Sequence, residues 1–223
     1  MASENYIHII KSLRRSIAMH VERDGRVIVR APALMPNFLI NQFIRDHADW
    51  IQKHRKVVCA RPRRKAREFK HGEPFLFMGK TLTLAVGRYT KIDVKDDRLL
   101  FPKFMEFRIQ KELTEWYKKH AIEVITRHVN EHTKIMGVSY EGIYFSDTKS
   151  KWGSCSHDNT LQFNWRLVMA PPLIIRYVVI HELTHTRHKN HSRAFWQQVG
   201  EYNPSYRRQV KWLRANGHLL TLT

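Results

Sequence analysis

The first hundred residues alternate between apolar and polar positions in short runs, the period expected of β-strands. Two such runs, at 16–21 and 27–30, flank the dipeptide Asp24-Gly25 and predict a hairpin. The segment from Asn37 to about Arg55 instead has apolar residues at helical spacing. Further strands are expected at 74–78, 81–86, 90–94 and 99–101. Residues 1–104 are therefore predicted to form a small β-rich region with one helix.

The second half of the chain has longer periods and predicts a separate domain over residues 105–223. A helical stripe runs from about Phe107 to Ile135, and Gly137 is expected to end it, because glycine favours the left-handed conformation found at helix C-termini. Pro171-Pro172 can open a later helix, since the first amides of a helix have no intrahelical partner. The remaining elements are expected at 143–146, 160–164 and 206–215. The predicted fold class is α+β.

One segment of the second half carries the pattern of a metal site. His181 and His185 are four residues apart, so on a helix they lie about 40° apart around the axis and both rings can reach one metal ion. Glu182 can then take a proton from a metal-bound water molecule. This is the arrangement of zincins, so residues 105–223 are predicted to form a zincin-like catalytic domain. Two hydrogen-bonded core histidines are the alternative interpretation. That alternative leaves Glu182 as a carboxylate without a partner in an apolar segment, which is costly.

A third protein ligand is required, because catalytic zinc usually takes three and leaves one position for water. His191 follows His185 by six residues, the offset at which metzincins place their third histidine. Ser192 is expected to be the N-cap of the next helix, which would hold His191 in place. Two other ligands stay open: Glu201, as a carboxylate on a second helix, and His188, close to the end of the first.

The charge and the cysteine content of the chain indicate its binding partners and its cellular compartment. The formal net charge is +19, and a positive field of that size attracts polyanions. Nucleic acid is therefore a possible partner, through Arg61, Arg63, Arg64 and Lys65. The chain has only Cys59 and Cys155, no visible export signal, and no apolar run near the ~20 residues that span a bilayer. These features predict a cytoplasmic protein with free thiols, without membrane contact.

Several separated blocks of the sequence resemble one known family. They are Lys151–Ser156 (KWGSCS), Leu161–Asn164 (LQFN), Tyr177–His185 (YVVIHELTH), and Asn190–Ser192 with Phe195-Trp196. In this order they are similar to the YgjP-like metallopeptidases, relatives of the SprT-like zincins. The resemblance implies that His181, His185 and His191 bind zinc and that Glu182 is the general base. It also implies that the block from Trp152 to Ser156 packs next to the site.

Other residues are candidates for the wall of the cleft. Trp152 and Cys155 are expected to shape it, and Cys155 is not needed as a nucleophile because the metal-bound water has that role. A donor usually stabilises the developing oxyanion. The candidates for that donor are Tyr202, Tyr206, Asn164 and Arg166.

Three substrate classes suit such a hydrolytic centre. The first and favoured one is a peptide or an exposed protein segment. The second is a protein held on nucleic acid, as kinship with SprT-like proteins suggests. The third is a nucleotide phosphoanhydride, whose oxygens could be clamped by Lys151, Arg166, Arg187, Lys189 and Arg193. A purely structural zinc ion is disfavoured, because structural sites are normally closed by four protein ligands.

Overall fold

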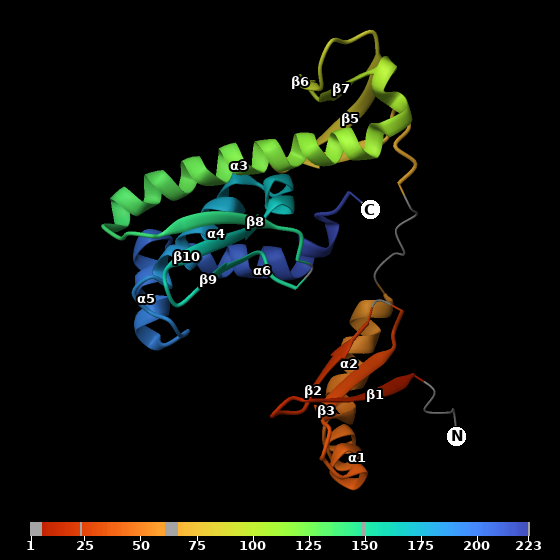
Figure 1. Cartoon of the computed structure of the whole chain (residues 1–223), viewed down its shortest axis with the longest axis vertical. Helices are drawn as coiled ribbons and strands as arrows, with labels where there is room; N and C mark the ends of the chain where they lie inside the picture. The colour runs from red at the N-terminus through yellow and green to blue at the C-terminus, as the bar shows by residue number, and fades with distance from the viewer. Residues whose placement is uncertain (1–5, 23, 61–66, 149, 223) are drawn as a thin grey trace. The chain divides into compact units, whose positions relative to one another are not determined.

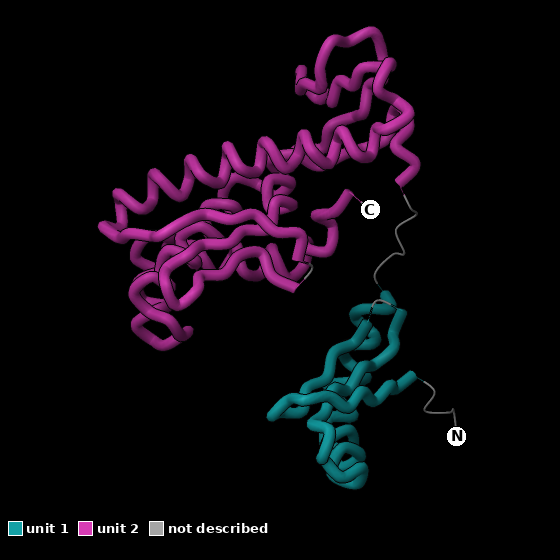
Figure 2. Tube along the Cα trace, viewed as in Figure 1, with its two compact units in different colours: residues 1–65 teal, residues 66–223 magenta. Residues whose placement is uncertain are grey.

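The computed structural model describes residues 6–22, 24–60, 67–148 and 150–222. Contacts divide the chain into two compact units, residues 1–65 and residues 66–223 (Figure 2). This boundary lies earlier in the chain than the predicted one at 104/105. The strands between 74 and 102 belong to the second unit, because their buried side chains form one continuous core with the helices that follow. Mixed helices and small sheets confirm the α+β class.

The first unit is a three-stranded sheet followed by two helices. The sheet has the order β1-β3-β2, with β1 at Ile7–Ser12, β2 at Ala18–Val21 and β3 at Val27–Pro32. Strands β2 and β3 pair antiparallel, so the predicted hairpin is confirmed. Strand β1 pairs parallel with β3 and was not predicted. Most of its side chains are exposed, so β1 has no buried face. Its sequence therefore lacks the strict apolar and polar alternation by which a strand is predicted.

The single helix predicted in the first unit is two helices. Helix α1 spans Asn37–Asp46 and α2 spans Ala48–Cys59, with a break at His47. The His47 ring contacts the carbonyl oxygen of Phe43 at 2.8 Å, within the last turn of α1. The helices bury Ile40 and Ile51 in a small core with β3. Helical spacing continues across the break, which is why the apolar pattern did not show it.

The second unit begins with a four-stranded sheet of order β4-β5-β7-β6. The strands are β4 (Pro74–Phe77), β5 (Lys80–Gly87), β6 (Asp93–Lys95) and β7 (Arg98–Pro102). Hydrogen bonds join this sheet to later parts of the chain. The Met78 amide donates to the Val168 carbonyl at 2.9 Å, and the Tyr117 hydroxyl donates to the Leu76 carbonyl at 2.8 Å. The sheet is thereby part of the unit that holds the histidine motif.

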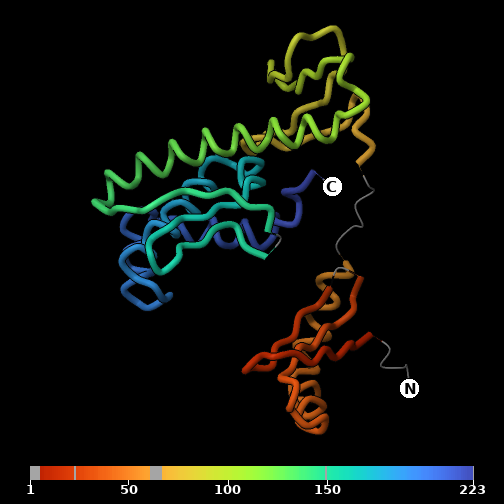
Figure 3. The backbone as a smooth tube through the Cα atoms, viewed as in Figure 1, coloured from red at the N-terminus to blue at the C-terminus, as the bar shows by residue number. Residues whose placement is uncertain are grey.

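A long helix crosses the second unit (Figure 1). Helix α3 spans Ile109–Met136, after a 3-10 turn η1 at Lys103–Arg108, and it ends at Gly137 with a left-handed φ of 60°. The predicted helix and its glycine stop are confirmed. A second sheet of order β8-β10-β9 follows, with β8 at Gly142–Ser146, β9 at Gly153–Cys155 and β10 at Thr160–Asn164. Figure 3 follows the chain from β8 through β9 into β10.

Helix α4, Pro172–Thr184, carries the histidine motif and is the most buried helix of the unit. It follows a 3-10 turn η2 at Trp165–Met169 and packs against α3, β9, α5 and α6. A helix that is apolar on all sides needs such cover. The last elements are α5 (Arg193–Tyr202), α6 (Tyr206–Asn216) and η3 (Gly217–Leu219). Among the described residues, no helix is both long and apolar enough to cross a membrane.

Candidate metal centre and catalytic site

Three imidazoles converge at the end of α4. His181 lies in the helix, His185 is the C-cap residue that follows it, and His191 comes from the turn that leads into α5. One donor nitrogen from each ring lies within 4.8 Å of the other two. The Nε2 atoms of His181 and His191 are 3.1 Å apart. The structure therefore brings together the three residues that the sequence spacing selected.

The turn that carries His191 is held from both sides. On one side, the Ser192 hydroxyl accepts a hydrogen bond from the Phe195 amide at 3.3 Å, so Ser192 is the N-cap of α5 as predicted. On the other side, Lys189 Nζ donates to the carbonyl of Ser156 at 2.9 Å and to Oδ1 of Asn159 at 2.6 Å. These two contacts fix the turn to the loop between β9 and β10. His191 thus has a defined place although its ring is exposed.

An aromatic wall supports the three imidazoles. The Phe195 ring centroid lies 4.9 Å from that of His181, 4.5 Å from His185 and 4.7 Å from His191. Trp196 stacks on His191 with a centroid distance of 5.6 Å. Rings packed in this way lose rotational freedom before any ligand binds, so the site is pre-organised. The sequence analysis noted Phe195-Trp196 only as part of a resemblance and did not predict this packing.

Hydrogen bonds set the orientation of two of the rings. His185 donates from Nδ1 to the His188 carbonyl at 2.9 Å, which leaves Nε2 free as a metal donor. The Tyr177 hydroxyl lies 3.5 Å from Nδ1 of His181 and can accept its proton. Burial, with a smaller effect from His185 and His191, lowers the pKa of His181 to about 3. His181 is therefore neutral at physiological pH, the state required of a metal ligand.

This donor set fits a zinc-type ion. With Zn–N bonds of about 2.0–2.1 Å, two nitrogens of a tetrahedral site lie about 3.3 Å apart. The 3.1 Å between the Nε2 atoms of His181 and His191 is close to that value. Three imidazole nitrogens leave one position free, which is the arrangement of catalytic rather than structural zinc.

Glu182 lies beside this cluster and against strand β9. Its side chain is buried, with an exposed fraction of 5%. A Cβ atom added to Gly153 would meet Glu182 Cγ and Oε1 at 2.6 Å, so the carboxyl group occupies the space that a side chain at 153 would need. Burial raises the pKa of Glu182 to about 8, while the charge of Lys151 lowers it. The site thus holds a carboxyl group of raised basicity next to the donor cluster.

The two alternative third ligands considered from the sequence, Glu201 and His188, lie outside the imidazole cluster. Glu201 is exposed near the end of α5 and does not join the imidazole cluster. His188 contributes its backbone carbonyl to His185, and its side chain is likewise outside the cluster.

The expected wall residues have mainly structural contacts. The Asn164 side chain donates to the Thr148 carbonyl and accepts from the Arg166 amide, so both its amide nitrogen and its oxygen already have hydrogen-bond partners. Arg166 pairs with Asp147 and lies over the Trp165 ring. Tyr202 packs against the core, and its carbonyl accepts from Arg176.

The other two expected wall residues, Trp152 and Cys155, belong to the tryptophan block. Trp152 packs against Gly217, where an added Cβ would lie 3.1 Å from the indole. Cys155 is half-buried on β9, and burial raises the pKa of its thiol. A thiol of raised pKa is a poor nucleophile at neutral pH. The role of Cys155 in the wall stays a prediction.

A groove next to the aromatic wall is strongly basic. It has a volume of about 440 Å³ and is lined by Trp196, Tyr206, Arg207, Val210, Lys211 and Arg214, which we call the basic groove. Trp196 stacks on Tyr206 at 5.3 Å as well as on His191, so the groove is separated from a cluster histidine by one ring.

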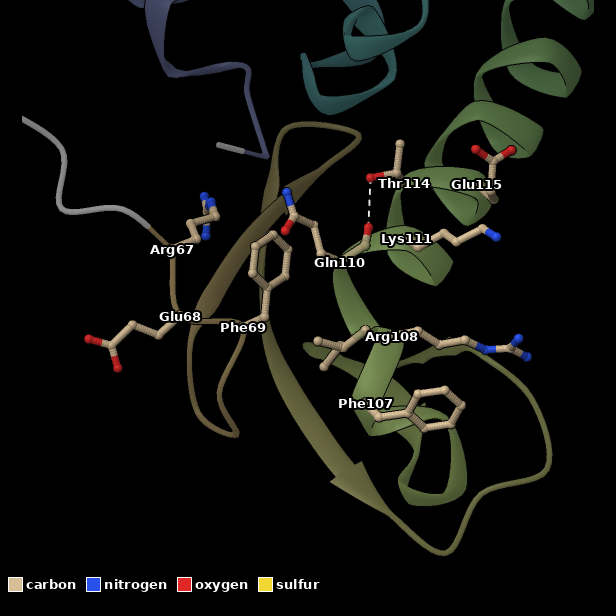
Figure 4. A pocket seen from close by; sticks show the side chains of 10 residues that line it. Arg67, Glu68, Phe69, Phe107, Arg108, Gln110, Lys111, Thr114 and Glu115 are labelled. Carbon is tan, nitrogen blue, oxygen red and sulfur yellow. Dashed lines mark hydrogen bonds between the residues drawn. The ribbon is translucent and has the colours of Figure 1, made fainter.

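Another pocket, of about 650 Å³, lies at the start of α3 (Figure 4). Its wall includes Arg67, Phe69, Phe107 and Lys111, and none of its lining residues comes from α4 or α5. It is therefore not part of the imidazole site. The basic residues proposed for nucleic acid, Arg61, Arg63, Arg64 and Lys65, lie outside the described residues.

Comparison with known proteins agrees with the chemistry of this site. The chain matches the YgjP-like metallopeptidase domain over residues 15–216. It is also similar to the metallopeptidase zymogen jannalysin of Methanocaldococcus jannaschii, with 25% identity over 43% of this chain and 96% of that chain, and a TM-score of 0.36. For the metallopeptidase zymogen abylysin of Pyrococcus abyssi the values are 20%, 43%, 94% and 0.38. No curated protein matches the chain.

The clustered imidazoles and the family match define a metal-dependent hydrolase. The chain belongs to the YgjP-like metallopeptidase family, since the match covers nearly its whole length. It is thus a metallopeptidase, which uses a divalent metal ion and acts on peptide or protein substrates. The family resemblance found in the sequence is confirmed.

Proposed function

We propose that this protein is a zinc peptidase in which His181, His185 and His191 bind the ion and Glu182 is the general acid–base. The convergence of three imidazole nitrogens within 4.8 Å carries the proposal. A zinc ion held there would polarise the scissile carbonyl and make a water molecule more acidic. No described carboxylate joins the three donors, which keeps the fourth position for water and substrate.

Glu182 performs the proton transfers in this proposal. In the metal-free protein, burial raises the pKa of Glu182, so its carboxylate accepts a proton more readily than an exposed glutamate. It takes the proton from the attacking water and later delivers it to the leaving amine. Gly153 lets it sit close to β9, so the carboxyl group needs no rearrangement before the reaction.

The edge of the second sheet offers a place for the substrate chain. Among the described residues β9 pairs only with β10, so we infer that its other edge accepts main-chain hydrogen bonds from an extended peptide. Because Gly153 in β9 touches Glu182, a peptide on this edge would lie beside the proton acceptor. Tyr177 acts as a positioning residue, because its hydroxyl accepts from His181.

The basic groove determines which side chains are favoured. Arg207, Lys211 and Arg214 line it, and none of them has a carboxylate partner among the described residues. An acidic side chain or a terminal carboxylate would form charge-assisted hydrogen bonds there. We infer that peptides with an acidic residue near the cleaved bond are preferred.

The phosphoanhydride alternative receives less support. Four of the five cations considered for a phosphate clamp have internal partners. Arg166 pairs with Asp147, and Arg187 donates to the Gly137 carbonyl. Lys151 donates to the Ser154 hydroxyl, and Lys189 donates to the Ser156 carbonyl in the β9–β10 loop. A cation already bound within the protein must break that contact before it can bind phosphate. Proteolysis on nucleic acid remains a second proposal, motivated by the net charge of +19.

A paired ligand substitution tests the metal assignment. His191→Ala should lose the zinc ion of this site and all peptide cleavage, whereas Glu201→Gln should keep both at the wild-type level. Zinc content is measured after dialysis, and cleavage is measured on an unfolded protein with and without DNA and beside a panel of nucleoside triphosphates. Normal zinc content in His191→Ala would exclude it as a ligand. Phosphate release without proteolysis would refute the peptidase.

A further inference from the structure

A second group of metal-donor side chains lies on α3. His128, Glu131 and His132 each place one donor atom within 4.8 Å of the other two. Residues three and four apart share one face of a helix, so the spacing of this HVNEH segment makes the cluster a property of the helix itself. None of these residues belongs to the imidazole site on α4 and α5, and the sequence analysis did not single them out.

His132 has the tautomer and rigidity of a metal ligand. Its Nδ1 donates to the His128 carbonyl at 2.9 Å, so the lone pair on Nε2 remains available. The residue is only 4% exposed, which fixes the ring in the packed interior. His185 in the first site is prepared in the same way, by a bond from Nδ1 to a backbone carbonyl.

His128 carries an unsatisfied nitrogen that faces the carboxylate. Its Nδ1 is buried and has no hydrogen-bond partner among the described residues. Glu131 Oε2 lies 3.9 Å away, too far for a hydrogen bond. Buried nitrogens of this kind normally have a partner, which can be a water molecule or an ion. Burial lowers the pKa of His128, so the ring is neutral and its lone pair can bind a cation.

We propose that His128, Glu131 and His132 form a second site for a divalent transition metal of the zinc type. Two imidazole nitrogens and one carboxylate oxygen are a donor set that zinc accepts. In a tetrahedral site a nitrogen and an oxygen donor lie about 3.4 Å apart, so the observed 3.9 Å needs an adjustment of about half an ångström. Glu131 can supply it, because its side chain is largely exposed.

The surrounding charges make this site weaker than the first one. Arg127 and Arg176 both lower the pKa of His128 through their charges, and the same charges oppose a bound cation. Glu131 acts in the opposite direction. Arg176 is held by a hydrogen bond to the Tyr202 carbonyl at 3.1 Å, so its charge stays near the cluster. The second site should therefore fill only after the first. An ion bound there would link two consecutive turns of α3.

Metal stoichiometry on the full chain tests the proposal. In a buffered zinc titration, the wild type should bind about two ions per chain, and Glu131→Gln should bind about one. A His181→Ala, His185→Ala double variant should keep about one ion of the weaker class. In that double variant, zinc should also raise the Tm, because an ion that binds only the folded state stabilises it.

Two variants control for folding and for non-specific histidine binding. Glu131→Gln alters an exposed side chain and should fold normally, whereas His132→Ala removes a buried ring. His120→Ala removes another α3 histidine whose Nδ1 contacts a backbone carbonyl, and it should leave both ions bound. Equal zinc binding by the wild type and Glu131→Gln would overturn the proposal. So would a single bound ion that disappears in the His181 and His185 double variant.

Discussion

Gly153 and Glu182 occupy one shared space: the carboxylate of Glu182 fills the position that a side chain at residue 153 would need. An added Cβ would lie 2.6 Å from Glu182 Oε1 and Cγ and 2.8 Å from Cδ. Cβ atoms essentially never approach other heavy atoms so closely, so either the carboxyl group or strand β9 would have to move. Glycine at 153 is therefore a condition for the placement of the proposed general base.

Gly153→Ala should reduce turnover while the metal remains bound. The methyl group displaces the Glu182 carboxyl, and a misplacement of about 1 Å can reduce the rate by about a hundredfold. The three heavy atoms nearest to the added Cβ all belong to Glu182 and none to a histidine ligand. Zinc content should therefore stay at the wild-type level. Both quantities are measured on one preparation, as peptide cleavage and as bound zinc.

Gly142→Ala is the matched control for this substitution. Gly142 is in β8 of the same sheet, and an added Cβ there would have an ordinary contact of 3.4 Å with the Tyr144 ring. The control should cleave peptide at nearly the wild-type rate. Equal activity of Gly153→Ala and Gly142→Ala would show that the close approach has no catalytic consequence.

The metal-free protein should lose stability as pH rises. The pKa of Glu182 is about 8 in the folded state against an ordinary value of 4.5. A raised carboxyl pKa favours the folded state while the group is protonated, and this contribution is lost between about pH 4.5 and pH 8. Each unit of pKa difference corresponds to about 1.4 kcal/mol. Glu182→Gln removes the charge and should therefore be relatively more stable at high pH.

Urea unfolding of metal-free wild type and Glu182→Gln at about pH 5 and about pH 8 measures this effect. The difference in unfolding free energy should shift in favour of the variant at the higher pH. The lowered pKa of His181 contributes to both proteins and so affects the difference little. A difference that does not change with pH would contradict the burial of an ionisable carboxyl group.

Arg214→Glu should change the peptide preference of the enzyme. The wild type is expected to have a lower KM for a peptide with glutamate near the cleaved bond than for the matching glutamine peptide, by about tenfold for one charge-assisted hydrogen bond. Reversal of the charge at 214 should abolish or invert this ratio. Lys119→Ala, an exposed charge on α3 outside the groove, should leave it unchanged. No glutamate preference in the wild type would exclude the basic groove as a binding site.

Elements with a strong period could be predicted from the sequence, and others could not. The hairpin around Asp24-Gly25 and the long helix ended by Gly137 were correct, because each has a local signal in the chain. The break at His47 was missed, since helical spacing continues through it. Strand β9 at Gly153–Cys155 was not predicted, because three residues are too few to show alternation.

Some features of the site also had a local signal in the sequence, and others did not. The spacing of His181, His185 and His191 favoured the three rings that converge, with Glu201 and His188 left open as alternatives, because helix geometry and a six-residue offset bring these rings together. The contact between Gly153 and Glu182 depends on packing between segments far apart in the sequence, so no local pattern could predict it. The α3 cluster around His128 did have a local spacing signal, but it lacks the usual order of the catalytic motif.

The central claim is that Glu182 transfers protons beside a zinc ion held by three histidines. It is tested most directly by measuring bound zinc and peptide cleavage on the same preparation of Glu182→Gln. We predict wild-type zinc content with cleavage reduced by about 10²–10⁴-fold, the usual contribution of a general acid–base. Cleavage at the wild-type rate with zinc bound would contradict the account.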